Sequence, residues 1–257
     1  QRAMDALSER VVLTLVRHPF VQKVYDTWHT PGTVYMAVGD YAMSLSQRIE
    51  KAGGFVTERA ARVIIAELVL AIETVHALDV VHRDISPDTI LLDRDGHVQL
   101  TGWGLCCPDV SAQRLTCDLV GTPDYQAPEM LAGQGWYGKE VDWWSVGVLL
   151  YEMLHGETPF MSNSQQGVYM KIRTEAPQFG KELSVHCTEL LSGLLQRDPT
   201  ERLGGDKLGG GATVKAQKWF AMHGVKWDRI LRRKALSPLS LSRQGGLETV
   251  GWVPQVG

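Results

Sequence analysis

The segment Val80–Leu92 carries the residues whose types could do chemistry. It reads Val-Val-His-Arg-Asp-Ile-Ser-Pro-Asp-Thr-Ile-Leu-Leu, so His82, Arg83 and Asp84 are neighbours, and Gly102-Trp103-Gly104 follows 18 positions after Asp84. A carboxylate can accept a proton from a hydroxyl group. Hard cations need several oxygen ligands, usually carboxylates, and a glycine has no side chain to offer. The chemistry open to Asp84 and to Gly102-Trp103-Gly104 therefore depends on the sequence pattern around them.

That pattern resembles the catalytic loop of a protein kinase, H-R-D-L-K-P-E-N, and Gly102-Trp103-Gly104 stands in the place of the family's D-F-G. The resemblance implies that Asp84, beside Arg83, is the base that accepts the hydroxyl proton of a substrate. The alternative is a surface aspartate that caps a turn.

Further motifs follow in the family's order. They are Gly121-Thr122-Pro123-Asp124-Tyr125-Gln126-Ala127-Pro128-Glu129, Val141-Asp142-Trp143-Trp144-Ser145-Val146-Gly147, Arg197-Asp198-Pro199-Thr200-Glu201-Arg202-Leu203-Gly204, and Trp219-Phe220 with Val225-Lys226-Trp227. From about residue 4 to 234 the chain resembles the AGC group of serine/threonine kinases, nearest to the ribosomal S6, Akt and SGK kinases. The resemblance implies an α+β fold, bilobal, with a mostly helical C-lobe and only a partial β N-lobe.

The chain departs from the family where nucleotide and metal are handled. Ser86 replaces a lysine, Thr89 offers one neutral oxygen in place of an asparagine amide, and Gly102 replaces the metal-binding aspartate. No glycine-rich loop and no V-A-I-K lysine precede the motifs, and Gly209-Gly210-Gly211 reads as a loop in the wrong half. We therefore expect no metal site and no cofactor; ATP and magnesium belong only to the reading in which the chain is an active kinase.

Other roles are implied by the resemblance alone. Thr122 belongs to the catalytic group, Leu91 is the floor under an adenine ring, and Glu9 is the helical glutamate that normally pairs with the nucleotide lysine. Leu91 is equally explained as plain core. Glu9, which has no lysine partner here, is better explained as a solvated helix glutamate.

A second set of residues is structural by the same resemblance. Asp142 holds the catalytic loop through backbone amides, and Glu129 and Arg202 form a bidentate ion pair. A stack of side chains links the two lobes, with Trp103 in the phenylalanine position. Its members are Leu13, Val24, Trp103, His82 and Asp142.

The last implied roles concern regulation and the peptide groove. Asp118 stands where the group has its activation-segment threonine, so it could mimic a phosphate and pair with Arg83, or be an ordinary loop aspartate. Asp88 and Glu152 match acidic residues that grip an arginine of the substrate. Ser44 stands at a third, normally acidic position, so the groove favours basic segments more weakly.

These residues need elements to position them. The hydrophobic patterns predict a helix over 4–16 that ends before His18-Pro19, and strands over Val21–Trp28 and Thr33–Val38 joined at Pro31-Gly32. Thr57 is predicted to cap a helix that runs to about Leu78. The remaining expectations are strands Ile90–Leu92 and His97–Thr101 around Asp95-Gly96, an irregular stretch from Cys106 to Pro128, and helices Val141–His155, Ser164–Arg173 and Val185–Gln196. The domain boundaries are 1–39 for the partial N-lobe, 40–234 for the C-lobe and 235–257 for a flexible tail.

Composition narrows the function classes. A net charge of −3 gives no reason to expect a nucleic-acid or membrane partner. The four cysteines have no metal-ligand spacing, and the eight tryptophans with His18, His76, His155 and His223 are expected to pack or lie at the surface. A cytoplasmic protein, or a nuclear one, is the expectation.

Three functions stay open. The first is a pseudokinase of the AGC group that acts as a scaffold or regulator by binding proteins, including those with basic segments. The second is a serine/threonine kinase that transfers the γ-phosphate of ATP, with the nucleotide lobe supplied upstream. The third is a fragment with no function of its own.

Overall fold

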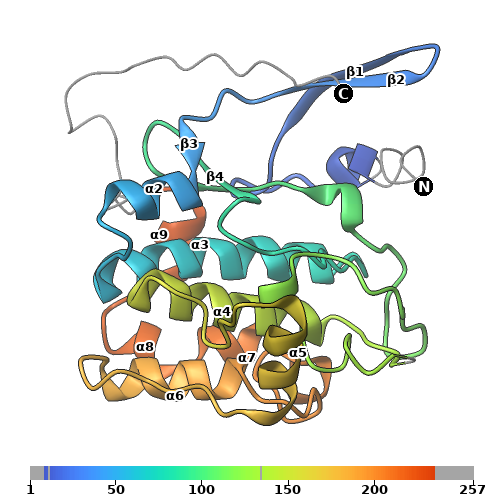
Figure 1. Cartoon of the computed structure of the whole chain (residues 1–257). Helices are drawn as coiled ribbons and strands as arrows, with labels where there is room; N and C mark the ends of the chain where they lie inside the picture. The colour runs from blue at the N-terminus through green and yellow to red at the C-terminus, as the bar shows by residue number, and fades with distance from the viewer. Residues whose placement is uncertain (1–8, 11, 134, 235–257) are drawn as a thin grey trace.

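The computed structural model describes residues 9, 10, 12–133 and 135–234. In this part of the chain a helical body carries two small antiparallel sheets, of order β1-β2 and β3-β4-β5. Figure 1 shows the helices stacked below the sheets, with the β1–β2 hairpin projecting at the top. The predicted α+β class is confirmed. The elements are β1 (Val24–Thr30), β2 (Thr33–Val38), β3 (Met43–Ser44), α2 (Leu45–Lys51), α3 (Glu58–His76), β4 (Ile90–Leu92), β5 (Val98–Leu100), η1 (Trp103–Leu105), η2 (Pro123–Tyr125), α4 (Glu140–His155), α5 (Gln165–Thr174), α6 (Val185–Leu194), η3 (Asp206–Leu208), α7 (Gly211–Lys215), α8 (Lys218–Ala221) and α9 (Trp227–Leu231).

Helix α3 crosses the centre of the molecule and begins as the sequence predicts. The Thr57 side chain accepts a hydrogen bond from the Ala60 amide, and Glu58 lies in the positive first turn. A cap of this kind is worth about 1 kcal/mol. The predicted apolar face is buried throughout. Its members are Ile64, Leu68, Ile72 and Val75.

Helix α4 lies beside α3 and is apolar on nearly every side. Trp143 and Trp144 are fully buried, so the helix passes through the interior instead of covering it. Asp142, in the first turn of α4, is a charged residue and is also fully buried. A buried carboxylate must be hydrogen-bonded, because isolating its charge would cost several kcal/mol. The core thus positions Asp142 for the loop described below.

The three-stranded sheet includes the last residues of the segment Val80–Leu92, because Ile90–Leu92 forms β4. Leu91 of β4 pairs with Ser44 on one side and with Gln99 on the other. Both strands predicted here are present, although β5 is Val98–Leu100 and not His97–Thr101. The turn that joins them brings Gly96 to a positive φ of 78°.

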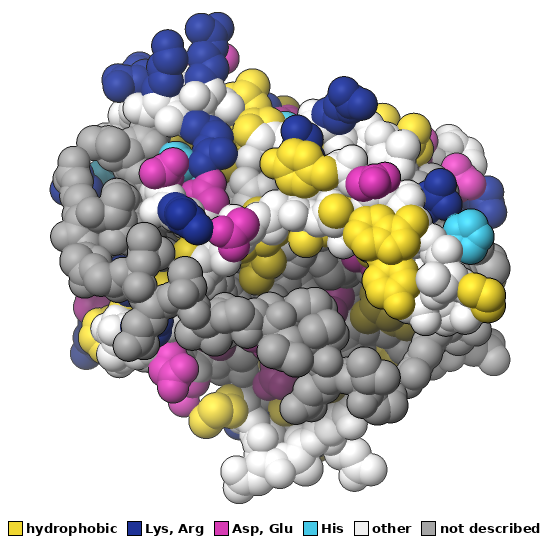
Figure 2. All heavy atoms as spheres, turned by 90° about the horizontal axis from the view of Figure 1, so that it is seen from above, with side chains coloured by type: hydrophobic (Ala, Val, Ile, Leu, Met, Phe, Trp, Pro, Cys, Tyr) yellow, Lys and Arg dark blue, Asp and Glu magenta, His cyan; other side chains and the backbone are white. Residues whose placement is uncertain are grey.

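The β1–β2 hairpin differs from the prediction in its first strand. β1 begins at Val24 and not at Val21, because Val21 forms an isolated parallel bridge with Leu100 of the other sheet. Most of the hairpin is exposed, including 51% of Trp28 and 65% of Tyr25. Trp28 stacks on Tyr35 across the strands at 5.6 Å. Figure 2 views this upper face and shows hydrophobic side chains at the surface between charged ones.

Other expectations are corrected in detail. Gly211 is the first residue of α7 and not part of a loop, because Gly209 and Gly210 end η3 and leave the chain free to begin a new helix there. Helix α6 ends at Leu194 and not at Gln196. The helix expected over 4–16 is present at residues 9, 10 and 12–15, and its remainder, like the tail 235–257, lies outside the described residues. No sequence pattern predicted α2, β3, α8 or α9.

Candidate functional site

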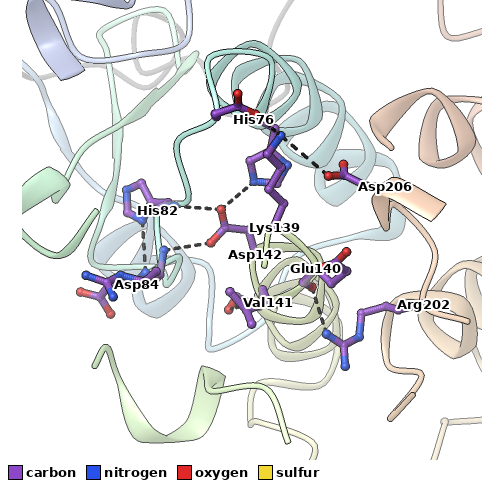
Figure 3. A network of polar contacts seen from close by, with 12 residues as sticks. His76, His82, Asp84, Lys139, Glu140, Val141, Asp142, Arg202 and Asp206 are labelled. Carbon is purple, nitrogen blue, oxygen red and sulfur yellow. Dashed lines mark hydrogen bonds and ion pairs between the residues drawn. The ribbon is translucent and has the colours of Figure 1, made fainter. Parts of the chain in front are cut away.

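Asp142 organises the loop that carries His82, Arg83 and Asp84. Its Oδ2 accepts hydrogen bonds from the His82 amide at 2.9 Å and from His76 Nε2 at 2.7 Å. Its Oδ1 accepts the Arg83 amide at 2.9 Å. Figure 3 shows contacts from α3 and from the loop converging on Asp142, which α4 carries. The predicted backbone contacts of Asp142 are therefore present.

The charge of Asp142 is stabilised by its partners. Burial alone would raise the pKa of this carboxyl, but the hydrogen bond from His76 and the two nearby histidines hold the pKa below its usual value. His76 was expected only to pack or lie at the surface, and its contact with Asp142 was missed. Nothing in its spacing marks it, because it lies 66 residues from Asp142.

Asp84 is held by Thr122. Its Oδ1 accepts the amide of Thr122 at 2.9 Å and the hydroxyl at 2.8 Å. Gly121 makes this approach possible, since a Cβ there would lie 2.3 Å from the Arg83 carbonyl oxygen and its φ is +90°. The second carboxylate oxygen of Asp84 forms no hydrogen bond within the described chain. The geometry suits a carboxylate that receives a hydroxyl from outside.

Thr89 is bound into the catalytic loop. Its hydroxyl donates to the Asp84 carbonyl at 2.7 Å and accepts the Ser86 amide at 3.0 Å. Ser86, which stands in the lysine position, is 2% exposed and brings no charge. The amide and carboxylate expected of a kinase at Thr89 and Gly102 are absent. Among the residues the structure describes, no group of three or more His, Cys, Asp and Glu side chains could hold a metal ion.

Trp103 lies in the interior next to the catalytic loop. It is fully buried, its indole donates to the Leu100 carbonyl at 3.2 Å, and its ring meets that of His82 edge-on at 4.6 Å. Leu13 is buried and Val24 half-buried. Trp103, His82 and Asp142 of the predicted stack are thus connected by direct contacts.

Arg83 is tied to the end of η1 and to the irregular segment between Cys106 and Pro128. Its Nε donates to the Leu105 carbonyl at 2.7 Å, and Nη1 approaches Asp118 Oδ2 at 3.1 Å. The predicted pairing of Asp118 with Arg83 is therefore present. Tyr137, which was not singled out from the sequence, lies 3.4 Å from the same Nη1 and donates to the Asp118 carbonyl at 2.5 Å.

Asp88 and Glu152 lie in one acidic region with Asp124. Burial raises the pKa of Glu152, and the charges of Asp88 and Asp124 raise it further. The Tyr125 hydroxyl donates to Glu152. Asp88 is exposed and accepts the Ser46 hydroxyl at 2.6 Å. Crowded carboxylates favour a cation, so the region suits a basic side chain of a partner.

The third groove position, Ser44, also lies near Asp88. Its hydroxyl is 2.7 Å from that of Ser46, and it caps α2 by accepting the Gln47 amide. The capping box of Ser44 and Gln47 is a sequence signal for α2 that the hydrophobic pattern does not show.

Glu129 and Arg202 form the predicted bidentate pair. Arg202 is fully buried, and its two terminal nitrogens lie 2.5 Å and 2.8 Å from the Glu129 oxygens. Nη1 also donates to the Glu140 carbonyl at 3.0 Å, which Figure 3 shows. The pair joins the end of the irregular segment to the loop before α7.

Leu91 and Glu9, the remaining predicted nucleotide-side residues, lie in different surroundings. Leu91 is half-buried between two fully buried neighbours of β4. Glu9 is half-buried, and burial raises the pKa of its carboxyl. A wholly solvated glutamate does not fit this position. Their roles toward a nucleotide stay predictions.

Comparison of the sequence with known protein families agrees with the contacts described above. The family model described as "Protein kinase domain" matches residues 1–220. The chain is 36% identical over 244 residues to serine/threonine-protein kinase gad8 of Schizosaccharomyces pombe, covering 95% of this chain and 42% of that protein.

Two other relatives support the same group. The cAMP-dependent protein kinase catalytic subunit PRKX of Homo sapiens is 37% identical over 90% of this chain and 63% of its own length. Serine/threonine-protein kinase YPK1 of Saccharomyces cerevisiae is 37% identical over 95% of this chain and 35% of its own length. The chain thus spans less than two thirds of each of these relatives.

No helix in the described part is long and apolar enough to cross a membrane.

Proposed function

The chain belongs to the protein kinase domain family and resembles AGC serine/threonine kinases. We propose that it is a catalytically impaired member of this family and that it acts by binding proteins. It holds polypeptides with basic segments along the surface of Asp84, Asp88 and Glu152 and does not transfer phosphate. Its partners are proteins, and it uses neither nucleic acid nor membrane. Its location is the cytoplasm, with the nucleus as the alternative.

The observation that carries this proposal is the contrast between the two sides of the site. On the protein-binding side, Asp84 is held by Thr122 and the acidic region keeps three carboxylates. On the nucleotide side, Ser86 and Gly102 supply no charge, and the Thr89 hydroxyl is engaged within its own loop. Phosphoryl transfer needs metal ions and positive charge around the phosphates. Protein binding needs only the protein-binding side, with Asp84 and the acidic region.

The nucleotide half of the proposal is tested by melting temperature. We expect no change with ATP, with or without magnesium. A ligand present at 100 times its Kd would stabilise the fold by about 2.7 kcal/mol, which is readily measured. A reproducible magnesium-dependent rise would contradict the proposal.

The protein-binding half is tested with a fluorescent peptide that carries two arginines upstream of a serine. We expect Asp88→Asn/Glu152→Gln to weaken its binding about tenfold, which corresponds to about 1.4 kcal/mol. Replacing Glu201, an exposed carboxylate in another part of the fold, with Gln is the matched control and should leave binding unchanged. Equal affinity for the same peptide with both arginines replaced by glutamine would contradict a basic-segment groove.

An active serine/threonine kinase is the second candidate, with the nucleotide-binding part contributed by residues beyond this chain. It is favoured by one observation, the intact contact of Asp84 with Thr122. It predicts phosphate transfer from labelled ATP that Asp84→Asn abolishes.

A further inference from the structure

Thr89 has all of its polar atoms engaged inside the protein. Besides the two hydroxyl contacts described above, its amide donates to the Ser86 carbonyl at 3.2 Å, and its carbonyl accepts the Thr101 amide at 2.8 Å. The Thr101 hydroxyl donates to the same carbonyl at 3.0 Å. A β-branched side chain has few χ1 choices, and the hydroxyl contacts select one of them. The methyl group of Thr89 therefore has a fixed direction.

That methyl group faces Gly102. A Cβ placed on Gly102 would lie 2.6 Å from Thr89 Cγ2 and 3.1 Å from Thr89 Cβ. Side-chain carbons in contact are normally about 3.5–4.0 Å apart. Gly102 also has φ 80° and ψ 34°, the left-handed region. A side chain at position 102 is therefore opposed both by the backbone and by Thr89.

The two obstacles can be separated, because aspartate and asparagine adopt the left-handed region more readily than other residues with a side chain. The backbone alone would thus strain an aspartate at Gly102 less than most other side chains. The Thr89 methyl adds a steric clash, since rotating it away from the 2.6 Å approach would break the hydroxyl contacts with Asp84 and Ser86. Thr89 is the obstacle specific to this chain.

The residues at these positions do not fit a divalent cation, and we infer that Thr89 closes the place from which position 102 would present a ligand to one. Gly102 and Thr89 form a coupled pair, because a metal-binding side chain at position 102 clashes with the Thr89 methyl. This inference rests on the proposed function, in which the chain works without a metal ion. It deepens that proposal by naming the residue that excludes the cation.

A double-mutant cycle tests the coupling through melting temperature. Gly102→Ala should lower the melting temperature on the order of 5 °C, as expected for an overpacked interior site. Thr89→Ser removes only the methyl and keeps the hydroxyl, so Gly102→Ala should cost clearly less in that background. Gly104→Ala is the matched control, because a Cβ at Gly104 meets no atom within 4 Å. An equal cost of Gly102→Ala in both backgrounds would overturn the inference.

A second measurement uses manganese(II) alone and follows its binding by electron paramagnetic resonance. Gly102→Asp should bind manganese no more tightly than the parent chain. Gly102→Asp/Thr89→Ser should bind it more tightly, because the carboxylate can now enter. If the single and double variants bind manganese equally, Thr89 does not close the site.

These outcomes are distinct from a failure of the proposed function. Magnesium-dependent ATP binding by the parent chain would contradict the impaired-kinase proposal without affecting the alanine cycle. Additive melting temperatures would remove the steric coupling even if the parent chain binds no nucleotide.

Discussion

The side chain of Arg83 illustrates how much of the site depends on single residues. It is nearly buried, with 8% of its side chain exposed, whereas 67% of the Asp118 side chain is exposed. Burial alone would lower the pKa of Arg83, but Tyr137 and Asp118 raise it. An ion pair with one exposed member is worth roughly 0–1 kcal/mol. Asp118 therefore contributes little to the stability of the segment 106–128 and does not order it alone.

Replacing Asp118 with Asn should loosen residues 106–128 slightly. We expect amide hydrogen exchange there to accelerate by no more than about fivefold, the equivalent of 1 kcal/mol, with the helical core unchanged. Tyr137→Phe, which removes the hydrogen bond to the Asp118 carbonyl, serves as the comparison. Unchanged exchange in the Asn variant would make Asp118 an ordinary loop aspartate.

The sequence could identify the site residues that belong to a recognisable motif. Asp142, Glu129 and Arg202 make the contacts the motifs implied. It could not identify His76, Tyr125 or Tyr137, because their partners lie far along the chain, 66, 27 and 54 residues away, and are brought near only by the fold. A tyrosine that donates to a carboxylate looks, in a sequence, like any core tyrosine.

The Glu129–Arg202 pair acts at the scale of elements, since it joins the segment before α4 to the loop before α7. Glu129→Gln should lower the free energy of unfolding by about 3–5 kcal/mol, because the buried guanidinium loses its counter-charge. Urea denaturation at neutral pH measures this change. Replacing Glu189, an exposed carboxylate on α6, with Gln should cost less than about 0.5 kcal/mol. Similar midpoints for the two variants would show that Arg202 is satisfied by its carbonyl contacts alone.

Long elements were predicted well and short ones were not. The apolar stripe and the cap of α3 fix its position, and α4 was predicted from its first core residue onward. The helices α7, α8 and α9 have four or five residues each, too few for a helical period to be detected. The start of β1 was misplaced because Val21 is as apolar as the strand that follows it, but bonds to the other sheet.

The β1–β2 hairpin leaves two strand edges and several large apolar side chains exposed. Such strands pair with other chains unless something covers them. We expect the isolated chain to self-associate, with a sedimentation coefficient that rises with concentration. Val34→Lys, which puts a charge on the exposed β2, should reduce the association, whereas Met222→Lys, at an exposed site on the helical side, should not. A monodisperse monomer with a sharp melt would contradict this expectation.

At the scale of the whole molecule, the partly buried His18 and the buried His82 make stability depend on pH. Burial lowers the pKa of His18 to about 4 and also lowers that of His82. The unfolded chain, with histidine pKa values near 6.5, binds these protons first as the pH falls. The stability these groups contribute is complete above pH 6.5 and is lost as the pH falls toward 4. Glu67, whose pKa burial raises, opposes this trend.

We therefore expect the urea midpoint to fall between pH 6.5 and 4. His18→Gln should flatten part of that fall, because a neutral side chain binds no proton in either state. His223→Gln, at an exposed position, should not. An identical pH profile for the His18 variant and the parent would show that the acid sensitivity has another origin.

The contact between Thr89 and Gly102 has a consequence for how such a chain could change over generations. A lineage that regained an aspartate at position 102 first would pass through a less stable protein, whereas one that first lost the Thr89 methyl would gain nothing that selection could favour. Since selection favours neither single substitution, the pair of Thr89 and Gly102 tends to persist. The order in which substitutions arise, more than their number, would decide whether a carboxylate can enter position 102.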